Sequence, residues 1–283
     1  MRLGAIEAGG TKFVLATGDI TGQVFERTVI KTTTPNETMA QVIQWFVDHP
    51  VERIGVGSFG PVDLSPSSPT YGSILQTPKL AWRGFNYLQA LAPLNVPIAL
   101  DTDVNVCALS ESILGAARDV DSCVYLTVGT GIGGGICING QTIKGLQHPE
   151  MGHIPVIRHP ADTYAGGCPS HTDCLEGLAS GPAIEARAGQ PAAKLAPDHL
   201  AFTIESDYLA QAIYTYALVL SPKRFVLGGG VMHVPGLLEQ IRNQVMQKNK
   251  GYLAHIDALP DYIVAPGLGD DVGIIGCFLI ASQ

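Results

Sequence analysis

The sequence carries little charge and few basic residues. Only 15% of its 283 residues are Asp, Glu, Lys or Arg, against about 25% in an average soluble protein. The 17 basic residues are outnumbered by 25 acidic ones, so the formal net charge is −8. A nucleic-acid-binding surface needs clustered Lys and Arg, so we expect no nucleic-acid partner. Hydrophobic residues make up 46% of the chain, which is too many for a disordered protein.

Cysteine is also scarce. The six cysteines are too few for a secreted scaffold held together by disulfides. Free cysteine is usually a small buried residue, and this is the role we predict for the four in apolar stretches: Cys107, Cys123, Cys137 and Cys277. The first residues, Met1 to Gly4, have neither the basic nor the long apolar region of a signal peptide. We therefore expect a cytoplasmic protein.

One run of the sequence, from Ser122 to Ile143, contains no charged residue and is long enough to span a bilayer. It contains six glycines together with Thr, Asn and Gln. Such a composition favours two buried strands joined by a glycine turn over a membrane helix. We therefore expect no membrane partner.

Glycine is abundant, with 33 residues in the chain. The glycines gather at three places, which are Gly9-Gly10, Gly129 to Gly135 and Gly228 to Gly230. Clustered glycine indicates points where the backbone must approach something closely. The first two clusters lie in strand–turn–strand patterns about 120 residues apart in sequence, which indicates a weak internal duplication with a cleft between two lobes.

Strand and helix patterns alternate along the chain, which predicts an α/β fold. The predicted strands are Leu3–Gly18 (two strands with a turn), Gln23–Lys31, Arg53–Ser58, Pro97–Leu100, Cys123–Val128, Ile132–Ile138, Arg224–Leu227 and Tyr262–Ala265. The predicted helices are Thr34–Asp48, Asp101–Ala117, one from Ser180, Leu200–Leu220, Pro235–Lys248 and Asp270–Ala281. Pro61–Arg83 and Gly145–Cys174 are predicted to be irregular. The apolar part of the long helix, Tyr208–Leu220, fits either the core or a subunit interface.

A tight glycine turn between strands can direct several backbone N–H groups at one anion. The segment Ala8–Lys12 adds a hydroxyl and an ammonium group to such a turn. None of the three turns has the spacing of a P-loop or of a dinucleotide-binding fold. Each turn alone fits a simple hairpin, but three in a duplicated setting favour a cleft that binds nucleotide phosphates.

The segment Asp101-Thr102-Asp103-Val104-Asn105 joins a predicted strand to a predicted helix. Phosphoryl transfer needs a carboxylate that takes the proton of the acceptor hydroxyl. The end of a strand at the mouth of an α/β cleft is a suitable position for that carboxylate. The alternative is that Asp101 or Asp103 only caps the helix.

Histidine and cysteine are regularly spaced in one irregular segment. Cys168, His171 and Cys174 are each three residues apart, and His153 precedes them. Four such ligands predict a closed, structural zinc site, with His148 and His159 as competitors for the place of His153. The alternative is a redox pair of cysteines among surface histidines. Glu150 and Glu176 flank the ligands and could bind a polyhydroxyl substrate, or could be solvated surface carboxylates.

These motifs together resemble the ROK family of sugar kinases, which has the two-lobed actin/hexokinase/Hsp70-like ATPase fold built on duplicated ribonuclease H-like domains. The resemblance covers nearly the whole chain. It rests on Glu7–Lys12, Asp101–Asn105, Thr127–Gly135, Glu150–His153 and Cys168–Glu176. It implies a hexose kinase that uses ATP and Mg²⁺, with Asp103 as the base on the sugar 6-hydroxyl, and a homodimeric assembly.

The resemblance also implies roles for individual residues. ATP contacts are implied for Gly9, Gly10, Thr11, Lys12, Thr130, Gly131, Pro182, Gly228, Gly229, Gly230, Val231 and Met232. Hexose contacts are implied for Asn105, Glu150, His153 and Glu176. Zinc ligands are His153, Cys168, His171 and Cys174, and Glu7 and Asp103 are expected to hold Mg²⁺ through water.

Two features depart from the common family pattern. Many members have Asp at position 7, where this chain has Glu7, and many glucokinase-type members have three Cys and one His on zinc, where this chain has His171. Both departures resemble the bacterial fructokinase branch, as does the ending Gly267–Gly276. We therefore expect D-fructose as the substrate, with mannose as a second one. The alternatives are a kinase for glucose or an N-acetylated amino sugar, and an inactive sugar sensor.

The resemblance predicts a division of the chain into two lobes. The N-terminal small lobe is expected over residues 1–117, with the closing helix 270–283 packed back onto it. The C-terminal large lobe is expected over 118–269 and contains the zinc loop 145–176.

Overall fold

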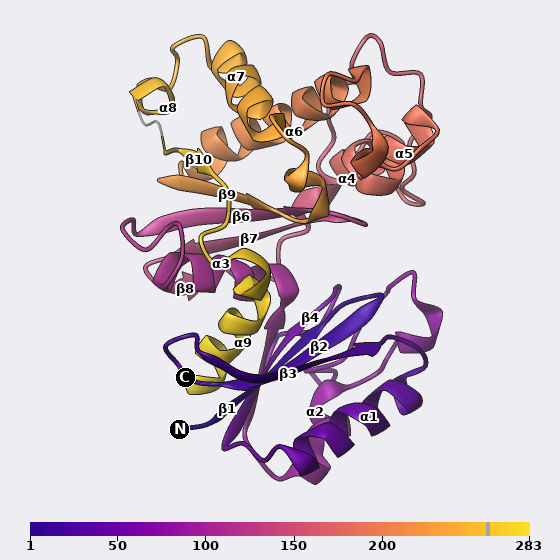
Figure 1. Cartoon of the computed structure of the whole chain (residues 1–283), viewed down its shortest axis with the longest axis vertical. Coiled ribbons are helices and arrows are strands. Elements are labelled where there is room, and N and C mark those ends of the chain that lie inside the picture. Colours follow the sequence, from indigo (N-terminus) through magenta and orange to yellow (C-terminus); the bar gives the residue numbers. More distant parts are fainter. Residues whose placement is uncertain (259–260) are drawn as a thin grey trace. The chain divides into compact units, whose positions relative to one another are not determined.

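The computed structural model describes residues 1–258 and 261–283, and the side chains of 257 and 258 are outside the description. The chain divides into two compact units (Figure 1). The first contains residues 1–115, 140–149 and 268–283, and the second contains 116–139 and 150–267. The segment 140–149, which the sequence-based division placed in the large lobe, packs with the first unit. No helix in the described ranges is long and apolar enough to cross a membrane.

The sheet of the first unit has the strand order β3-β2-β1-β4-β5. Its strands are β1 (Leu3–Ala8), β2 (Lys12–Gly18), β3 (Val24–Lys31), β4 (Arg53–Ser58) and β5 (Ile98–Thr102). The first three strands are antiparallel neighbours, while β1, β4 and β5 run parallel. The carboxyl ends of β1, β4 and β5 therefore lie at one edge of the sheet, where α/β proteins place their ligands.

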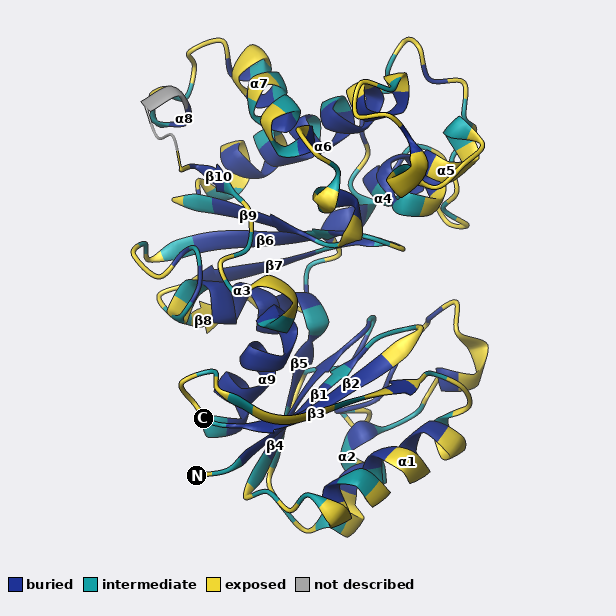
Figure 2. Ribbon diagram, in the orientation of Figure 1, coloured by how far each residue is buried: buried dark blue, intermediate teal, exposed yellow. Residues whose placement is uncertain are grey.

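The first unit also contains α1 (Pro35–Asp48), α2 (Tyr87–Leu91), α3 (Asp103–Ile113), α9 (Val272–Ser282), the 3₁₀ helices η1 (Leu80–Trp82), η2 (Ala92–Leu94) and η6 (Gly269–Asp271), and the short strand β8 (Gln141–Thr142). Helix α1 begins where sequence predicts, because the hydroxyl of Thr34 accepts the Glu37 N–H and Pro35 occupies the first turn. Figure 2 shows its exposed and buried residues on opposite sides.

Within the second sheet, the four strands that belong to the second unit have the order β10-β9-β6-β7. Its strands are β6 (Ser122–Val128), β7 (Ile132–Ile138), β9 (Arg224–Gly228) and β10 (Ile263–Val264). Strands β6 and β7 are antiparallel, and β6 and β9 are parallel. The charge-free run that begins at Ser122 thus forms two buried strands around a glycine turn, as predicted.

The helices of the second unit are α4 (Leu175–Ala179), α5 (Gly181–Ala188), α6 (Leu200–Leu220), α7 (Leu237–Asn249) and α8 (Ala254–Ala258), with the 3₁₀ helices η3 (Met151–His153), η4 (Ala192–Lys194) and η5 (Gly230–His233). Both units share one arrangement, in which an antiparallel hairpin is followed by a strand parallel to its first strand. The predicted α/β class and the duplicated pattern are confirmed.

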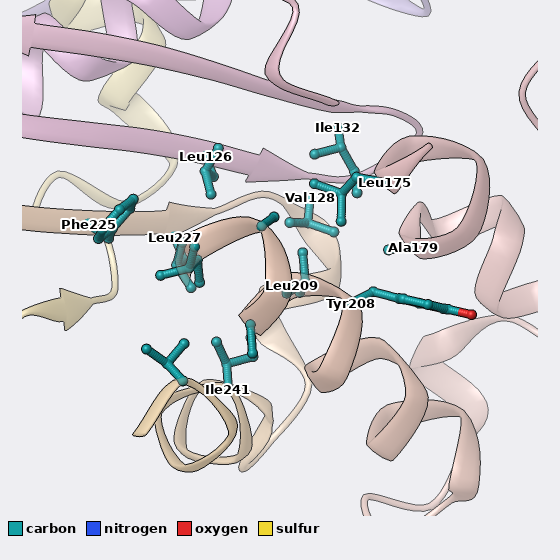
Figure 3. Close-up of a cluster of buried hydrophobic side chains, with 14 of the residues drawn as sticks. Leu126, Val128, Ile132, Leu175, Ala179, Tyr208, Leu209, Phe225, Leu227 and Ile241 are labelled. Carbon is teal, nitrogen blue, oxygen red and sulfur yellow. The ribbon is translucent and has the colours of Figure 1, made fainter. Parts of the chain in front are cut away.

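Helix α6 forms the centre of the second core. Figure 3 shows Leu209 of this helix among Leu227 of β9, Val128 of β6 and Ile241 of α7. Twelve of its side chains between Ala201 and Ala217 are buried, and Val219 beyond is 74% exposed. Most of the apolar helix is therefore core. The four cysteines predicted to be buried, Cys107, Cys123, Cys137 and Cys277, are all at most 8% exposed.

A buried ionic group lies beside α6. The Arg187 guanidinium donates two hydrogen bonds to the Asp162 carboxylate, at 2.9 and 2.8 Å, and the Tyr208 hydroxyl donates a third at 2.8 Å. Although burial opposes ionisation of Asp162, these hydrogen bonds prevail and hold its pKa at about 2. Nearby on α6, Glu205 is fully buried and neither carboxyl oxygen has a partner among the described residues. Burial raises the pKa of Glu205, and the charge of Arg187 offsets this only in part.

Glu205 predicts how stability depends on pH. Because its folded pKa is raised, its contribution to stability is present below the unfolded value of about 4.3 and is lost as pH rises towards the folded value. Glu205→Gln removes this proton uptake. We expect the variant to gain unfolding free energy relative to the parent between pH 5 and 8, by at most about 1.4 kcal/mol per pH unit.

Urea denaturation at each pH measures this difference. Glu185→Gln, which changes an exposed residue of α5, is the matched control and should stay parallel to the parent. A Glu205→Gln difference that is constant with pH would contradict the prediction.

Candidate active site

The first glycine turn joins β1 to β2. The Gly9 N–H donates to the Lys12 carbonyl at 3.0 Å, and a Cβ on Gly9 would lie 2.7 Å from that same oxygen. Position 9 must therefore be glycine. Thr32, which directly follows β3, holds the turn in place because its hydroxyl donates to the Gly9 carbonyl at 2.8 Å. Thr11 and Lys12 are exposed, so the turn is open to a ligand.

The second glycine turn joins β6 to β7. The Gly129 N–H donates to the Gly131 carbonyl at 2.9 Å, and the Gly181 N–H donates to the Gly129 carbonyl at 2.7 Å. Helix α5 therefore begins directly on this turn, with Pro182 in its first turn. Thr130 at the tip is exposed.

The third glycine segment follows β9 and packs against the same region. Gly229 has φ of 92°, and a Cβ there would lie 2.4 Å from the Val128 carbonyl oxygen. Only glycine combines this backbone conformation with so close an approach. Val231 is buried, and its Cγ2 lies 3.6 Å from the Cβ position of Gly181. The structure thus brings together three predicted segments of the second unit: Thr130–Gly131, the start of α5 with Pro182, and Gly228–Met232.

Asp103 is the first residue of α3. Thr102, not Asp103, is the helix cap, because its hydroxyl accepts the Asn105 N–H at 3.1 Å. Thr102 therefore fills the capping role that was the alternative interpretation of Asp103. Asp103 Oδ1 accepts the adjacent Val104 N–H at 2.9 Å.

Glu7 lies at the same edge of the first sheet as Asp103. Glu7 is the register partner of Gly57 on β4, and the Asp103 Cα lies 3.5 Å from the Cβ position of Gly57. A Cβ on Gly273 of α9 would lie 2.8 Å from the Glu7 carboxyl carbon, so glycine there makes room for the carboxylate. Burial raises the pKa of Glu7, although the nearby Lys12 charge lowers it.

Asp101 has an anchoring role that sequence analysis missed. It is 2% exposed, and its Oδ1 accepts from Asn105 Nδ2 at 2.7 Å. Its Oδ2 accepts from Thr142 Oγ1 at 3.0 Å and from the Lys144 ammonium at 2.9 Å. Because Asp101 is only an acceptor, the Asn105 amide must turn its nitrogen inward. Asn105 Oδ1 is then a buried acceptor with no partner in the part of the chain described, as a hydroxyl-binding group would be.

The predicted zinc ligands converge in the second unit. The ligand atoms of His153, Cys168, His171 and Cys174 all lie within 4.8 Å of one another. Cys168 Sγ is 3.6 Å from His171 Nδ1 and 3.9 Å from His153 Nδ1, and Cys174 Sγ is 3.7 Å from His153 Nδ1. Tetrahedral zinc with its usual bond lengths sets such ligand atoms about 3.5 Å apart, so the donor set fits the ion.

The two competing histidines lie elsewhere. His148 Nε2 accepts the Val62 N–H at 3.2 Å, within the first unit. His159 Nδ1 accepts the Ala161 N–H at 3.2 Å. Neither joins the cluster among the described residues. Burial raises the pKa of the Cys174 thiol to about 11, so a thiolate there needs a cation beside it.

Glu176 connects this cluster to the second glycine turn. Its Oε2 accepts the Ile132 N–H at 2.9 Å, and its Oε1 lies 3.9 Å from His153 Nε2. A Cβ on Gly131 would lie 2.5 Å from Glu176 Oε2, so glycine admits the carboxylate. Glu150, exposed at the start of η3, accepts the His153 N–H through its carbonyl at 3.0 Å. No sequence signal showed that Glu176 reaches the glycine turn.

Comparison with known proteins identifies the family. A sequence model of the ROK family matches residues 3–283. The chain is 44% identical to a fructokinase of Pediococcus pentosaceus, covering 100% of this chain and 98% of the relative. It is 42% identical to a fructokinase of Lactococcus lactis subsp. cremoris, covering 98% and 96%. A ROK hexokinase of Thermus thermophilus superposes with a TM-score of 0.78 at 25% identity, over 100% of this chain and 98% of that one. The chain belongs to the ROK family.

Proposed function

We propose that the chain is an ATP-dependent fructokinase, which transfers the terminal phosphoryl group of ATP to the 6-hydroxyl of D-fructose, with mannose as a second substrate. The fructokinases of Pediococcus and Lactococcus support the choice of sugar. The structural observation that carries the proposal is the meeting of an open glycine turn, Glu7 and Asp103 at one edge of the first sheet.

Asp103 is the proposed general base. Its carboxylate accepts the proton of the 6-hydroxyl while that oxygen attacks the terminal phosphorus and ADP leaves. A positioned base contributes about 10²–10⁴-fold to the rate. The Thr102 cap and the Asp101 anchor hold the start of α3, and with it Asp103, in place.

Asn105, Glu150, His153 and Glu176 are the proposed sugar contacts. Asn105 is the best supported, because its buried Oδ1 lacks a donor and an unmet buried acceptor costs about 1–3 kcal/mol. A sugar hydroxyl would supply that donor. Asp101 fixes the orientation of the amide by holding its nitrogen.

The proposed ATP contacts are the three glycine segments with Pro182: Gly9–Lys12, Thr130–Gly131 and Gly228–Met232. Glu7 and Asp103 are the residues that would hold Mg²⁺ through water, as two carboxylates near each other suit this cation. When bound, Mg²⁺ supplies positive charge that neutralises the phosphates.

A structural zinc ion is proposed at His153, Cys168, His171 and Cys174. Four protein ligands fill a tetrahedral ion and leave no position for catalysis. Its proposed role is to hold the irregular segment before α4 and so place Glu176. A homodimer and a cytoplasmic location also belong to the proposal, and sedimentation velocity of the purified chain tests the dimer.

Two alternatives make different predictions in one experiment. A coupled assay of ADP release with fructose, mannose, glucose and N-acetylated amino sugars ranks the substrates by kcat/KM. Fructose should rank first. A preference for glucose or an N-acetylated sugar would correct the substrate, and nucleotide binding without turnover on any sugar would indicate a sensor.

Asp103→Asn should lower kcat by about 10²–10⁴-fold while ATP affinity stays within a few-fold of the parent. The carboxamide keeps the shape of the side chain but cannot take the proton. Steady-state kinetics and calorimetric ATP titration measure the two quantities. Asp48→Asn, at the exposed end of α1, is the control for the loss of one carboxylate. A near-normal kcat in Asp103→Asn would exclude Asp103 as the base.

The purified chain should contain about one zinc ion per chain by elemental mass spectrometry. Cys168→Ser combined with Cys174→Ser should remove the metal and lower the midpoint of thermal unfolding, because structural zinc contributes directly to folding. His159→Gln alters a histidine outside the cluster and should keep the metal. A zinc-free parent, or a double variant that keeps full stability and activity, would disprove the site.

A further inference from the structure

Lys79 lies against the first glycine turn, although it comes from a loop far away in sequence. Its Cε is 2.5 Å, and its ammonium nitrogen 3.5 Å, from the position that a Cβ on Gly10 would take. The lysine therefore occupies the space that glycine leaves beside the turn. No motif in the sequence had indicated a role for Lys79.

The loop that carries Lys79 is firmly held at its backbone. The Thr77 side chain is buried and accepts the Lys79 N–H at 3.3 Å, while Arg83 Nε donates to the Thr77 carbonyl at 2.7 Å. The Lys79 carbonyl accepts the Trp82 N–H at 2.9 Å. Such a loop delivers the ammonium to one place at little further entropic cost.

Trp82 fixes this loop to the same strands that form the turn. Its side chain is 2% exposed and its ring centroid lies 5.4 Å from that of Phe13 on β2. Its Nε1 donates to the Thr33 carbonyl at 2.9 Å. The position of Lys79 relative to Gly10 therefore follows from packing inside one unit.

The turn carries positive charge that the protein does not neutralise by ion pairing. Within residues 1–258 and 261–283, neither Lys12 nor Lys79 forms an ion pair, whereas Lys144, Lys223 and Lys248 do. The charge of Lys12 lowers the pKa of the half-buried Glu7 carboxyl. Two exposed ammonium groups beside one glycine turn form a place for an anion, in a chain with a net charge of −8.

The position of the turn indicates which anion binds. The turn follows β1, and Asp103 follows β5 at the same edge of the sheet. The phosphoryl group that meets the hydroxyl next to Asp103 is the terminal one of ATP. The negatively charged group at this turn is therefore the terminal phosphate and not the α-phosphate.

We propose that Lys79 is a second cationic contact, with Lys12, to the terminal phosphate of ATP, and that it stabilises the charge on the phosphoryl oxygens during transfer. This inference rests on the proposed function. Charge-assisted contacts of this kind are well suited to phosphoryl transfer, which depends on positioning and electrostatic stabilisation. Gly10 is then required partly because any side chain would displace Lys79.

Calorimetric titration with AMP-PNP and with ADP, both with Mg²⁺, tests the contact without turnover. Lys79→Met keeps the length of the side chain and removes its charge. We expect AMP-PNP affinity to fall about tenfold or more and ADP affinity to stay unchanged, with kcat for fructose falling on the order of 10²-fold. Lys79→Arg keeps the charge and should recover part of the AMP-PNP affinity.

Lys31→Met is the matched control, because Lys31 is the exposed register partner of Lys12 and also lacks an ion pair among the described residues. It should leave both affinities nearly unchanged. Equal losses for AMP-PNP and ADP in Lys79→Met, no loss at all, or the same loss in Lys31→Met would overturn the proposal. A parent chain that binds AMP-PNP but phosphorylates no hexose would overturn only the proposed function.

Discussion

Direct contact between one backbone and another is the constraint on which the rest of this structure depends. A Cβ on Gly55 of β4 would lie 1.9 Å from the Cys277 carbonyl oxygen of α9, and one on Gly276 would lie 2.0 Å from the Val106 carbonyl oxygen of α3. Helices α9, α3 and the sheet can approach this closely only without side chains between them. The lack of a side chain also makes room at the glycine turns, where Gly131 admits the side chain of Glu176 and Gly10 admits that of Lys79. The glycines therefore serve the packing of the sheet and the shape of the turns by one physical means.

The carboxyl groups inside the two units differ in how far their charges are compensated. Asp101 is buried but its oxygens accept hydrogen bonds from several elements of the first unit, so its charge is well compensated. Asp162 is compensated in the same way by Arg187. Glu205 has no such compensation and Glu7 has only partial compensation, so burial raises both pKa values. Of these two incompletely compensated carboxyls, Glu205 lies in the core of the second unit. Glu7 lies at the proposed site of the first unit.

The local features of the fold could be predicted from the sequence. Strands such as β1 and β6 and the start of α1 at Thr34 follow from patterns a few residues long. The convergence of Cys168, His171 and Cys174 also follows from short spacing. Short helices such as α2 and α4 were missed, because segments of five residues carry too weak a periodic signal.

Contacts between distant segments could not be predicted in this way. Asp101 and Lys144 are far apart in sequence, as are Gly10 and Lys79. No sequence pattern around one residue of a pair indicates its contact with the other. Side chains from loops reach their partners only after the sheet has placed the loop ends. The contacts of Asp101 with Thr142 and Lys144 are thus a property of tertiary packing, which is visible in the structure and not in a motif.

His153 connects the cysteine pair of the predicted zinc site to Glu176, which contacts the second glycine turn. Its Nδ1 faces the sulfur atoms of Cys168 and Cys174, and its Nε2 faces Glu176. A histidine that ligates a metal through one nitrogen commonly has its other nitrogen held by a carboxylate. Cys174 also caps α4, the helix that carries Glu176, by accepting the Gly177 N–H. A cation at this cluster would therefore fix both the ring and the helix start, and through Glu176 it would fix the first residue after the second glycine turn.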